Sequence, residues 1–447
     1  MKKTFLVVIM LFFQITFFIL LESCASDTAG AHHYNFNTTD ESGMPYPDVS
    51  FAVLSDIHTF DPSIHSPKSE FLQKRLHGSK LFSDSIPLLD FAIDNILASG
   101  VSFVIVPGDL TKDGELTNHQ ITAEKFKRLT DAGIAVFVTP GNHDINNAKA
   151  VRFTENGSKQ IPGVSADKFA QVYKNFGFSS VISRDANSLS YAAEPVEGLW
   201  LLSLDSCRHS ESKNRSSPYA SGRFKGKTIN WINKVLSDAH KNKKAVIVMM
   251  HHGVVEHFRG QGKSAPSYII ADFNNVGRLF ASWNVRVVFS GHSHTQDIAR
   301  ADFGGKYIYD IQSGSTVTPP FCPMRFVELK DNVMHIRTVF LAENIYPDTD
   351  FAQEIYNLHR AAIKAPLISK MRSQSIKRAE YELISNAIAD AVIAHNNGDE
   401  NPANRVRINV SALSAKARSF YKKYSEKLDI YWTDIPPGDN NISLNLD

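Results

Sequence analysis

The sequence contains little cysteine: three residues, Cys24, Cys207 and Cys322, in a chain of 447. They lie far apart and form no Cys-x-x-Cys pair, which excludes a zinc-thiolate site and a disulfide framework. A single bridge between Cys207 and Cys322 stays open in an oxidising compartment. Any metal site in this chain must therefore be built from other side chains.

An excess of charge of one sign is also lacking. Lysine and arginine number 48 and aspartate and glutamate 46, which gives a formal net charge of +2. Proteins that bind nucleic acid or an anionic membrane surface usually carry a marked basic excess. The sequence therefore indicates no specific nucleic-acid partner.

Long apolar runs are missing except near the start of the chain. Two lysines precede an almost uniformly apolar run over residues 5–21, a pattern typical of an export signal, here residues 1–23. A retained membrane span is disfavoured because the run is at the short end for one. We expect an exported protein.

The residues that follow the apolar run suggest how the chain is held after export. Leu21-Glu22-Ser23-Cys24 resembles a bacterial lipobox, although Glu22 is unusual in its middle. The resemblance implies a lipid anchor at Cys24, which would make the membrane a partner and the bacterial periplasm or cell envelope the location. Signal cleavage without lipidation is the alternative. Residues 24–47, rich in Ser, Thr, Gly, Asn and Asp, are predicted to be a tether.

From residue 48 onward, short apolar runs alternate with amphipathic helical patterns, which predicts an α/β domain over residues 48–345. The expected strands are residues 49–54, 103–106, 135–138, 200–204, 245–250, 285–289, 307–311, 325–329 and 334–340. The expected helices are residues 85–99, 120–131, 351–364, 376–395 and 412–428. Residues 346–447 are therefore predicted to be a C-terminal, mainly helical appendage with a polar tail.

Five short polar motifs follow expected strands of the α/β domain. They are Asp56-x-His58, Gly108-Asp109, Gly141-Asn142-His143-Asp144, His251-His252 and Gly291-His292-Ser293-His294. Loops at the carboxyl ends of neighbouring strands gather in one crevice, so residues far apart in sequence become neighbours there. Each motif alone is common, but five in order at strand ends indicate one shared site.

The side chains in these motifs suit metal ions. Imidazoles, carboxylates and one amide oxygen favour Mn, Fe or Zn as divalent ions. Asp109 is the candidate for bridging two ions, since a carboxylate has two oxygens. Two ions about 3.5–4 Å apart can bind a phosphate group between them and turn a bridging water into hydroxide. The pattern therefore favours hydrolysis of a phosphate ester.

The five motifs together resemble the calcineurin-like metallophosphoesterase superfamily. The resemblance implies a four-layer α/β/β/α sandwich with a C-terminal helical appendage, and a dinuclear metal site at the strand ends. It places Asp56, His58, Asp109 and His294 on one metal and Asp109, Asn142, His251 and His292 on the other. It also implies that His143 is a non-ligand acting near the leaving group, oriented by Asp144.

One ligand is ambiguous in the sequence. His251 is followed two residues later by Gly253, which matches the family pattern, so His251 is preferred. His252 is the alternative.

Departures from subfamily patterns narrow the function. Asp144 stands where protein Ser/Thr phosphatases have Glu, and Lys112 stands where purple acid phosphatases have Tyr. The motifs look most like the branch with class III cyclic-nucleotide phosphodiesterases and glycerophosphodiesterases. We therefore expect a hydrolase in which a dimetal-bound hydroxide attacks a small phosphate ester, most simply a phosphodiester. A phosphomonoesterase, an envelope-lipid phosphoesterase and a non-catalytic binding protein are the alternatives.

Overall fold

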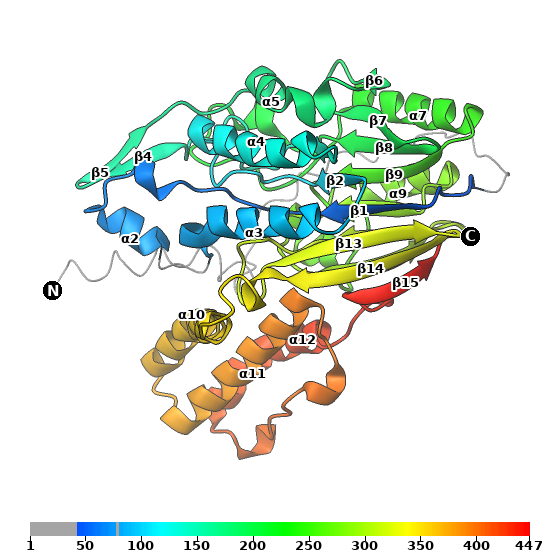
Figure 1. The fold of residues 1–447 in the computed structure, drawn as a ribbon. Coiled ribbons are helices and arrows are strands. Elements are labelled where there is room, and N and C mark those ends of the chain that lie inside the picture. The colour runs from blue at the N-terminus through cyan, green and yellow to red at the C-terminus, as the bar shows by residue number, and fades with distance from the viewer. Residues whose placement is uncertain (1–42, 77–79) are drawn as a thin grey trace.

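The computed structural model describes residues 43–76 and 80–447 (Figure 1). The predicted export signal, Cys24 and the predicted tether up to residue 42 lie outside the described residues. No helix among the described residues is long and apolar enough to cross a membrane.

Two β-sheets pack face to face, as predicted for a four-layer sandwich. One sheet has the strand order β15-β14-β13-β1-β2-β3 and the other the order β11-β12-β10-β9-β8-β7-β6. The first sheet contains β1 (Val49–Val53), β2 (Phe103–Val106), β3 (Ala135–Val138), β13 (Pro323–Lys330), β14 (Val333–Phe340) and β15 (Asn441–Asn445). The second contains β6 (Ser183–Arg184), β7 (Tyr191–Val196), β8 (Leu199–Leu204), β9 (Ala245–Met250), β10 (Val287–Ser290), β11 (Asp297–Asp302) and β12 (Tyr307–Gln312). All nine expected strands are present, with ends that differ by at most three residues.

The alternation of side chains along the strands explains the four layers. In the second sheet, Ile247 and Phe289 belong to the core between the sheets, whereas Val248 and Val288 belong to a separate core beneath the outer helices. Successive residues of a strand point to opposite faces, so one apolar run serves both cores. The ring of Phe51 in β1 meets that of Phe289 edge-on at 5.4 Å between centroids, which joins the two sheets.

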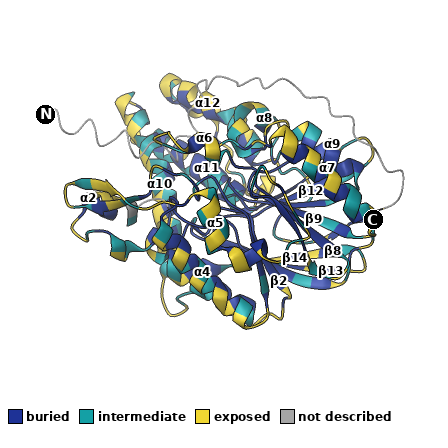
Figure 2. Cartoon of the chain, turned by 90° about the horizontal axis from the view of Figure 1, so that it is seen from above, coloured by how far each residue is buried: buried dark blue, intermediate teal, exposed yellow. Residues whose placement is uncertain are grey.

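Helices cover the outer face of each sheet (Figures 1 and 2). The helices α3 (Ser85–Leu97) and α4 (Leu116–Asp131) pack with the first sheet, and α7 (Gly226–Lys241) and α9 (Phe273–Ser282) with the second. Smaller elements complete the domain: α2 (Glu70–Leu76), the hairpin of β4 (Val151–Thr154) and β5 (Gly157–Gln160), α5 (Ala166–Val172), α6 (His209–Ser212) and α8 (Gln261–Ser264).

Three long helices form the predicted C-terminal helical region. They are α10 (Phe351–Ser373), α11 (Arg378–Asn397) and α12 (Ala415–Tyr431), and they enclose an apolar core of their own around Ile384, Phe420 and Leu428. Such a core buries apolar surface independently of the sandwich.

The predicted polar tail after α12 contains a strand that the sequence did not predict, because β15 pairs antiparallel with β14, with Ile442 opposite Ile336. The boundary at residue 346 therefore separates helices from the sandwich only as far as α12. Cys207 and Cys322 are both buried and unpaired, so the bridge left open above is not formed.

Candidate dinuclear metal centre

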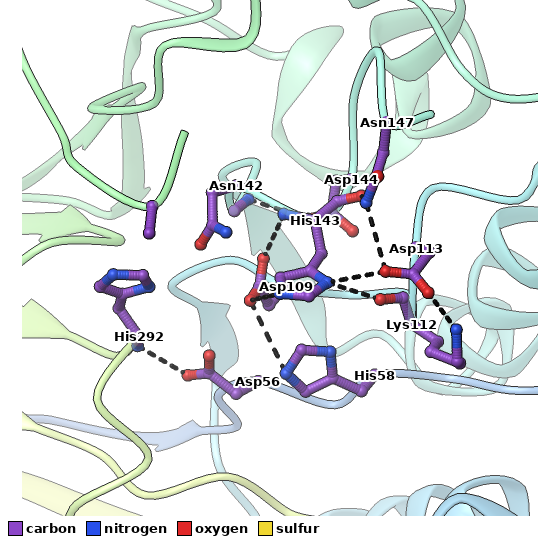
Figure 3. A network of polar contacts seen from close by, with 12 residues as sticks. Asp56, His58, Asp109, Lys112, Asp113, Asn142, His143, Asp144, Asn147 and His292 are labelled. Carbon is purple, nitrogen blue, oxygen red and sulfur yellow. Dashed lines mark hydrogen bonds and ion pairs between the residues drawn. The ribbon is translucent and has the colours of Figure 1, made fainter. Parts of the chain in front are cut away.

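The loops after β1, β2, β3, β9 and β10 bring the predicted ligands together at one end of the sandwich (Figure 3). Asp56, His58 and His251 have no exposed surface, and Asp109 is 1% exposed. One group of potential ligands contains Asp56, His58, Asp109 and His294, and a second contains Asp109, His251 and His292. Within each group, one ligand atom per residue lies within 4.8 Å of the others.

Asp109 belongs to both groups and lies between them. Its Oδ2 atom is 3.6 Å from Nε2 of His58 and 3.6 Å from Nε2 of His251. Asn142 joins the second group through its Oδ1 atom, which lies 3.1 Å from Nε2 of His251. His294 joins the first, with Nε2 3.2 Å from Oδ1 of Asp56. The arrangement suits a carboxylate shared by two cations.

The backbone at these positions is strained. Five predicted ligands adopt a left-handed conformation with positive φ: Asp56, His58, Asp109, His292 and His294, at 48°, 46°, 49°, 71° and 60°. Non-glycine residues rarely occupy this region, and each such residue costs on the order of 1–3 kcal/mol. Five cases in one cluster indicate that the loops are held in shape for a function.

Two motif glycines are required by close packing around the carboxylates. A Cβ atom at Gly141 would overlap the backbone and carboxylate of Asp109, and one at Gly291 would overlap Ser55 and the carboxylate of Asp56. Neither carboxylate could keep its place beside a larger residue.

Hydrogen bonds to the far side of the imidazoles fix which nitrogen faces the centre. Nδ1 of His251 donates to the carbonyl oxygen of Pro107 at 2.8 Å, which leaves Nε2 with a free lone pair. Nε2 of His292 donates to the carbonyl oxygen of Ser267 at 3.0 Å, which leaves the lone pair of Nδ1 for the centre. Burial lowers the pKa of His292 well below its ordinary value, so the ring is neutral, as a metal ligand must be.

His252 points away from the centre. Its Nδ1 lies 2.8 Å from Oγ of Ser206, and its Nε2 donates to the carbonyl oxygen of Ala220 at 2.8 Å. With both nitrogens engaged, His252 is a buried structural residue. The geometry therefore favours His251 as the ligand, as the sequence pattern does.

His143 stands beside the bridging carboxylate and is more accessible than the ligands. Its Nε2 atom lies 4.0 Å from Oδ2 of Asp109, and its side chain is 22% exposed. Nδ1 donates to the carbonyl oxygen of Lys112 at 2.7 Å and lies 3.2 Å from Oδ1 of Asp113. Burial would lower the pKa of His143, but the charges of Asp109 and Asp113 outweigh it and raise the pKa.

The expectation that Asp144 orients His143 is wrong. The carboxylate of Asp144 accepts from the backbone N–H groups of Leu110, Thr111 and Gly141 at 3.1, 2.9 and 2.8 Å and from Oγ1 of Thr111 at 2.9 Å. A carboxylate that satisfies three buried N–H groups joins the loop after β2 to the loop after β3. Asp113 takes the orienting position instead.

The sequence patterns also missed Lys80. Its ammonium group, on a side chain that is largely buried, lies 3.1 Å from Nε2 of His58 and brings positive charge to the first ligand group. No motif surrounds it, since it precedes α3 on a loop distant in sequence from the ligands. In the loop after β8, Arg208 and Arg223 both form ion pairs with Glu211.

The residues present fit a pair of divalent cations. Oδ1 of Asp56 is buried and faces Nε2 of His294 at 3.2 Å, while Oδ2 accepts from Ser55 and from the backbone of His292. Burial would raise the pKa of Asp56, but His294 and His251 outweigh it and lower the pKa, so the group is an anion. A buried anionic oxygen among imidazole nitrogens is what a metal ion requires.

The fold and this site define a class: hydrolases of phosphoric esters with a dinuclear metal centre. The family model described as calcineurin-like phosphoesterase matches residues 49–296, more than half of the chain. The chain therefore belongs to the calcineurin-like phosphoesterase family, whose members use paired divalent metal ions. No curated protein matches the sequence.

Solved structures that match this chain include a dimetal phosphatase from Danio rerio, with 15% identity, a TM-score of 0.47, and coverage of 66% of this chain and 97% of that one. The sulfate thiohydrolase SoxB of Thermus thermophilus is 13% identical, with a TM-score of 0.36 and coverage of 73% and 62%. The purple acid phosphatase PPD1 of yellow lupin (Lupinus luteus) is 11% identical, with a TM-score of 0.39 and coverage of 67% and 53%.

Proposed function

We propose that this protein hydrolyses a phosphodiester at the centre built around Asp109. The observation that carries the proposal is the position of His143, which is held by Lys112 and Asp113 with Nε2 4.0 Å from the shared carboxylate. The two cations would be held by Asp56, His58, Asp109 and His294 and by Asp109, Asn142, His251 and His292. When bound, such a pair neutralises phosphate charge and activates water at neutral pH.

His143 is suited to assist the departing oxygen of the ester. Since the proton on Nδ1 is committed to the carbonyl oxygen of Lys112, a second proton on the ring resides on Nε2, which faces the centre. The negative charges of Asp109 and Asp113 favour that protonated form. An alkoxide is a poor leaving group, and a proton donated from Nε2 would convert it into an alcohol.

The charges around the centre support a diester rather than a monoester. A diester carries one negative charge, whereas a monoester carries up to two near neutral pH. Lys112 is paired with Asp113, and Arg208 and Arg223 are paired with Glu211, which leaves these side chains little charge for a second anionic oxygen. Lys80 beside His58 adds one positive charge, which suits the single negative charge of a diester. The resemblance of the motifs to the phosphodiesterase branch supports the same substrate class.

The experiment compares bis(p-nitrophenyl) phosphate with p-nitrophenyl phosphate, for protein loaded with Mn²⁺, Fe²⁺ or Zn²⁺ in turn. We expect a higher kcat/KM for the diester and a loss of about 10²–10⁴-fold in kcat for His143→Ala. A strong preference for the monoester would contradict the diester assignment. Near-normal rates for both His143→Ala and Asn142→Ala would contradict the site itself.

We also propose that the protein acts at a bacterial cell envelope, anchored through a lipid on Cys24. The support is the export pattern of residues 1–23 and the Leu21-Glu22-Ser23-Cys24 sequence. Metabolic labelling with a fatty-acid analogue should mark the wild-type protein and not Cys24→Ser. Equal labelling of both would refute the anchor.

A further inference from the structure

A second group of potential ligands lies where the C-terminal helices meet the sandwich. Asp297 is the first residue of β11, His395 is in the last turn of α11, and Glu400 follows that helix. One ligand atom from each lies within 4.8 Å of the other two, and all three side chains are buried. None of them belongs to the five motifs of the catalytic centre.

The three residues combine two carboxylates with one neutral imidazole. Nδ1 of His395 lies 2.6 Å from Oε1 of Glu400, and burial lowers the pKa of His395, so the ring is neutral. Its face packs on the ring of Tyr431 at 4.8 Å with an interplanar angle of 16°, which fixes its orientation. Two oxygens and one nitrogen are a ligand set that Zn²⁺ accepts.

The other oxygen of Glu400 points to a missing partner. The side chain of Glu400 is 2% exposed, and its buried Oε2 atom accepts from no N–H or hydroxyl group among the described residues. The carboxyl group within its hydrogen-bonding reach is that of Asp439, which is also an acceptor when ionised. An unpartnered carboxylate oxygen in the interior costs several kcal/mol unless a cation or a proton meets it. Nε2 of the neighbouring His257 is also buried and forms an ion pair with Asp310.

Carboxyl groups outnumber cationic side chains around this group. Nδ1 of His257 lies 2.6 Å from Oδ1 of Asp297, and Nε2 of His257 lies 3.6 Å from Oδ2 of Asp310. Besides Asp297 and Glu400, the acidic residues here include Asp310, Asp434 and Asp439, and the cationic side chains are His257 and the fully buried Arg325. Burial and the charge of Asp297 raise the pKa of Glu400 to about 9. A carboxylate in this position needs either a proton or a metal ion.

The backbone holds the group in place. The N–H of Gln296 donates to the carbonyl oxygen of Asn396 at 2.9 Å, and Nδ2 of Asn440 donates to the carbonyl oxygen of Asn397 at 2.7 Å. A Cβ atom at Gly398 would overlap Asp439, so the turn after α11 approaches the sandwich as closely as glycine permits. The three side chains therefore converge from a fixed frame, as a binding site requires.

We propose that Asp297, His395 and Glu400 bind a divalent cation that fastens α11 to β11, separately from the catalytic pair. Because Asp297 lies three residues after His294, the cation would also stabilise the loop that carries two catalytic-centre ligands. Its role would be structural, since every residue of the group is buried. Such a site contributes its binding free energy to folding.

Glu400→Gln distinguishes a cation from a proton, because glutamine mimics a protonated glutamate but is a poor metal ligand. The full-length protein would first be stripped of metal, then reloaded with Zn²⁺ and separated from unbound Zn²⁺. Mass spectrometry would then count the bound zinc ions, and thermal unfolding would give the Tm. We expect Glu400→Gln to lose about one zinc per chain and to have a lower Tm. The matched control is His359→Gln, a buried histidine of α10 outside both sites, which should keep its zinc.

Unchanged zinc content together with an equal or higher Tm for Glu400→Gln would overturn the proposal in favour of a shared proton. A second measurement remains decisive if that variant does not fold. Saturated wild-type protein should hold three zinc ions per chain, and a count of two would overturn the proposal. The outcome does not depend on the diester assignment, because it reads metal content rather than turnover.

Discussion

The imidazole of His143 is held by Asp113, thirty residues earlier in the chain, and not by the adjacent Asp144. Oδ1 of Asp113 lies 3.2 Å from Nδ1 of His143 and also accepts from Asn147, while the other carboxylate oxygen binds the ammonium group of Lys112 (Figure 3). A carboxylate in this position fixes the ring and stabilises its protonated form.

Asp113→Asn should therefore reduce turnover without removing the metal ions. We expect kcat to fall by about 10- to 100-fold, because outer partners of active-site groups commonly have effects of this size. Because removing the charge of Asp113 lowers the pKa of His143, the loss of rate on the alkaline side of the pH profile should also shift toward lower pH. The measurement is kcat against pH, with metal content as the control.

Asp144→Asn is the matched comparison. Since Asp144 accepts from three backbone N–H groups, its loss should lower the free energy of unfolding by about 3 kcal/mol. Urea denaturation measures this. If Asp144→Asn shifted the pH profile and Asp113→Asn did not, the roles assigned to the two residues would be reversed.

Variants of the two adjacent histidines after β9 should differ in how much metal the protein binds. His251→Ala removes an imidazole that faces Asp109 and Asn142, so the protein should lose metal and activity together. His252→Ala removes hydrogen bonds to Ser206 and Ala220, so it should lower Tm while metal binding persists. Elemental analysis of both variants would show the difference. Metal loss in His252→Ala alone would make His252 the ligand and His251 the structural residue.

Lys80→Met should weaken catalysis while the metal ions stay bound. The ammonium group lies beside His58, where the phosphate of a substrate would meet the first cation. A hydrogen bond to a charged group is worth about 1.5–3 kcal/mol, which corresponds to roughly 10- to 100-fold in kcat/KM. Lys80→Arg, which retains the charge, is the control. Equal kcat/KM for Lys80→Met and wild type would show that the residue does not meet substrate.

The pair of His209 and Asp205, outside the metal centre, should make the free energy of unfolding fall as pH rises. Nε2 of His209 lies 2.7 Å from Oδ2 of Asp205. Burial would lower the pKa of His209, but Asp205 outweighs it and raises the pKa. A raised pKa in the folded state gives stability that is complete below the unfolded pKa of about 6.5 and is lost as pH rises through the folded value.

The free energy of unfolding, measured with urea from pH 6 to pH 9, should therefore decline more steeply in wild type than in His209→Gln. Asp205 contributes no slope in this range, because its own pKa is held below the ordinary value despite its burial. Parallel curves for the two proteins would contradict the pairing.

The strands and the ligand motifs could be predicted because both are local features of the sequence. A run such as Ala245–Met250 has too few polar residues to be anything but a buried strand, and His251 follows it directly. The same reasoning failed for Asp144, because adjacency in sequence says little about where a side chain points in a loop. Lys80 reaches the centre through tertiary structure alone.

Strands at the sheet edges were harder to predict. Asn441–Asn445 alternates polar and apolar residues over a short span, and only its antiparallel pairing with β14 identifies it as a strand. The group at Asp297, His395 and Glu400 could not be predicted either, because Asp297 lies 98 residues before His395, and the end of α11 separates His395 from Glu400.

The pairing of β14 with β15 also has a consequence for engineering. The chain leaves the sheet after Phe340, passes through three helices and returns to the same sheet at Asn441. The helices are thus inserted between two strands that are neighbours in the sheet. Truncating the chain before α10 would remove the edge strand β15 and expose β14 as the new edge. A variant meant to lack the helices should keep residues 441–447 and join them to β14 through a short turn.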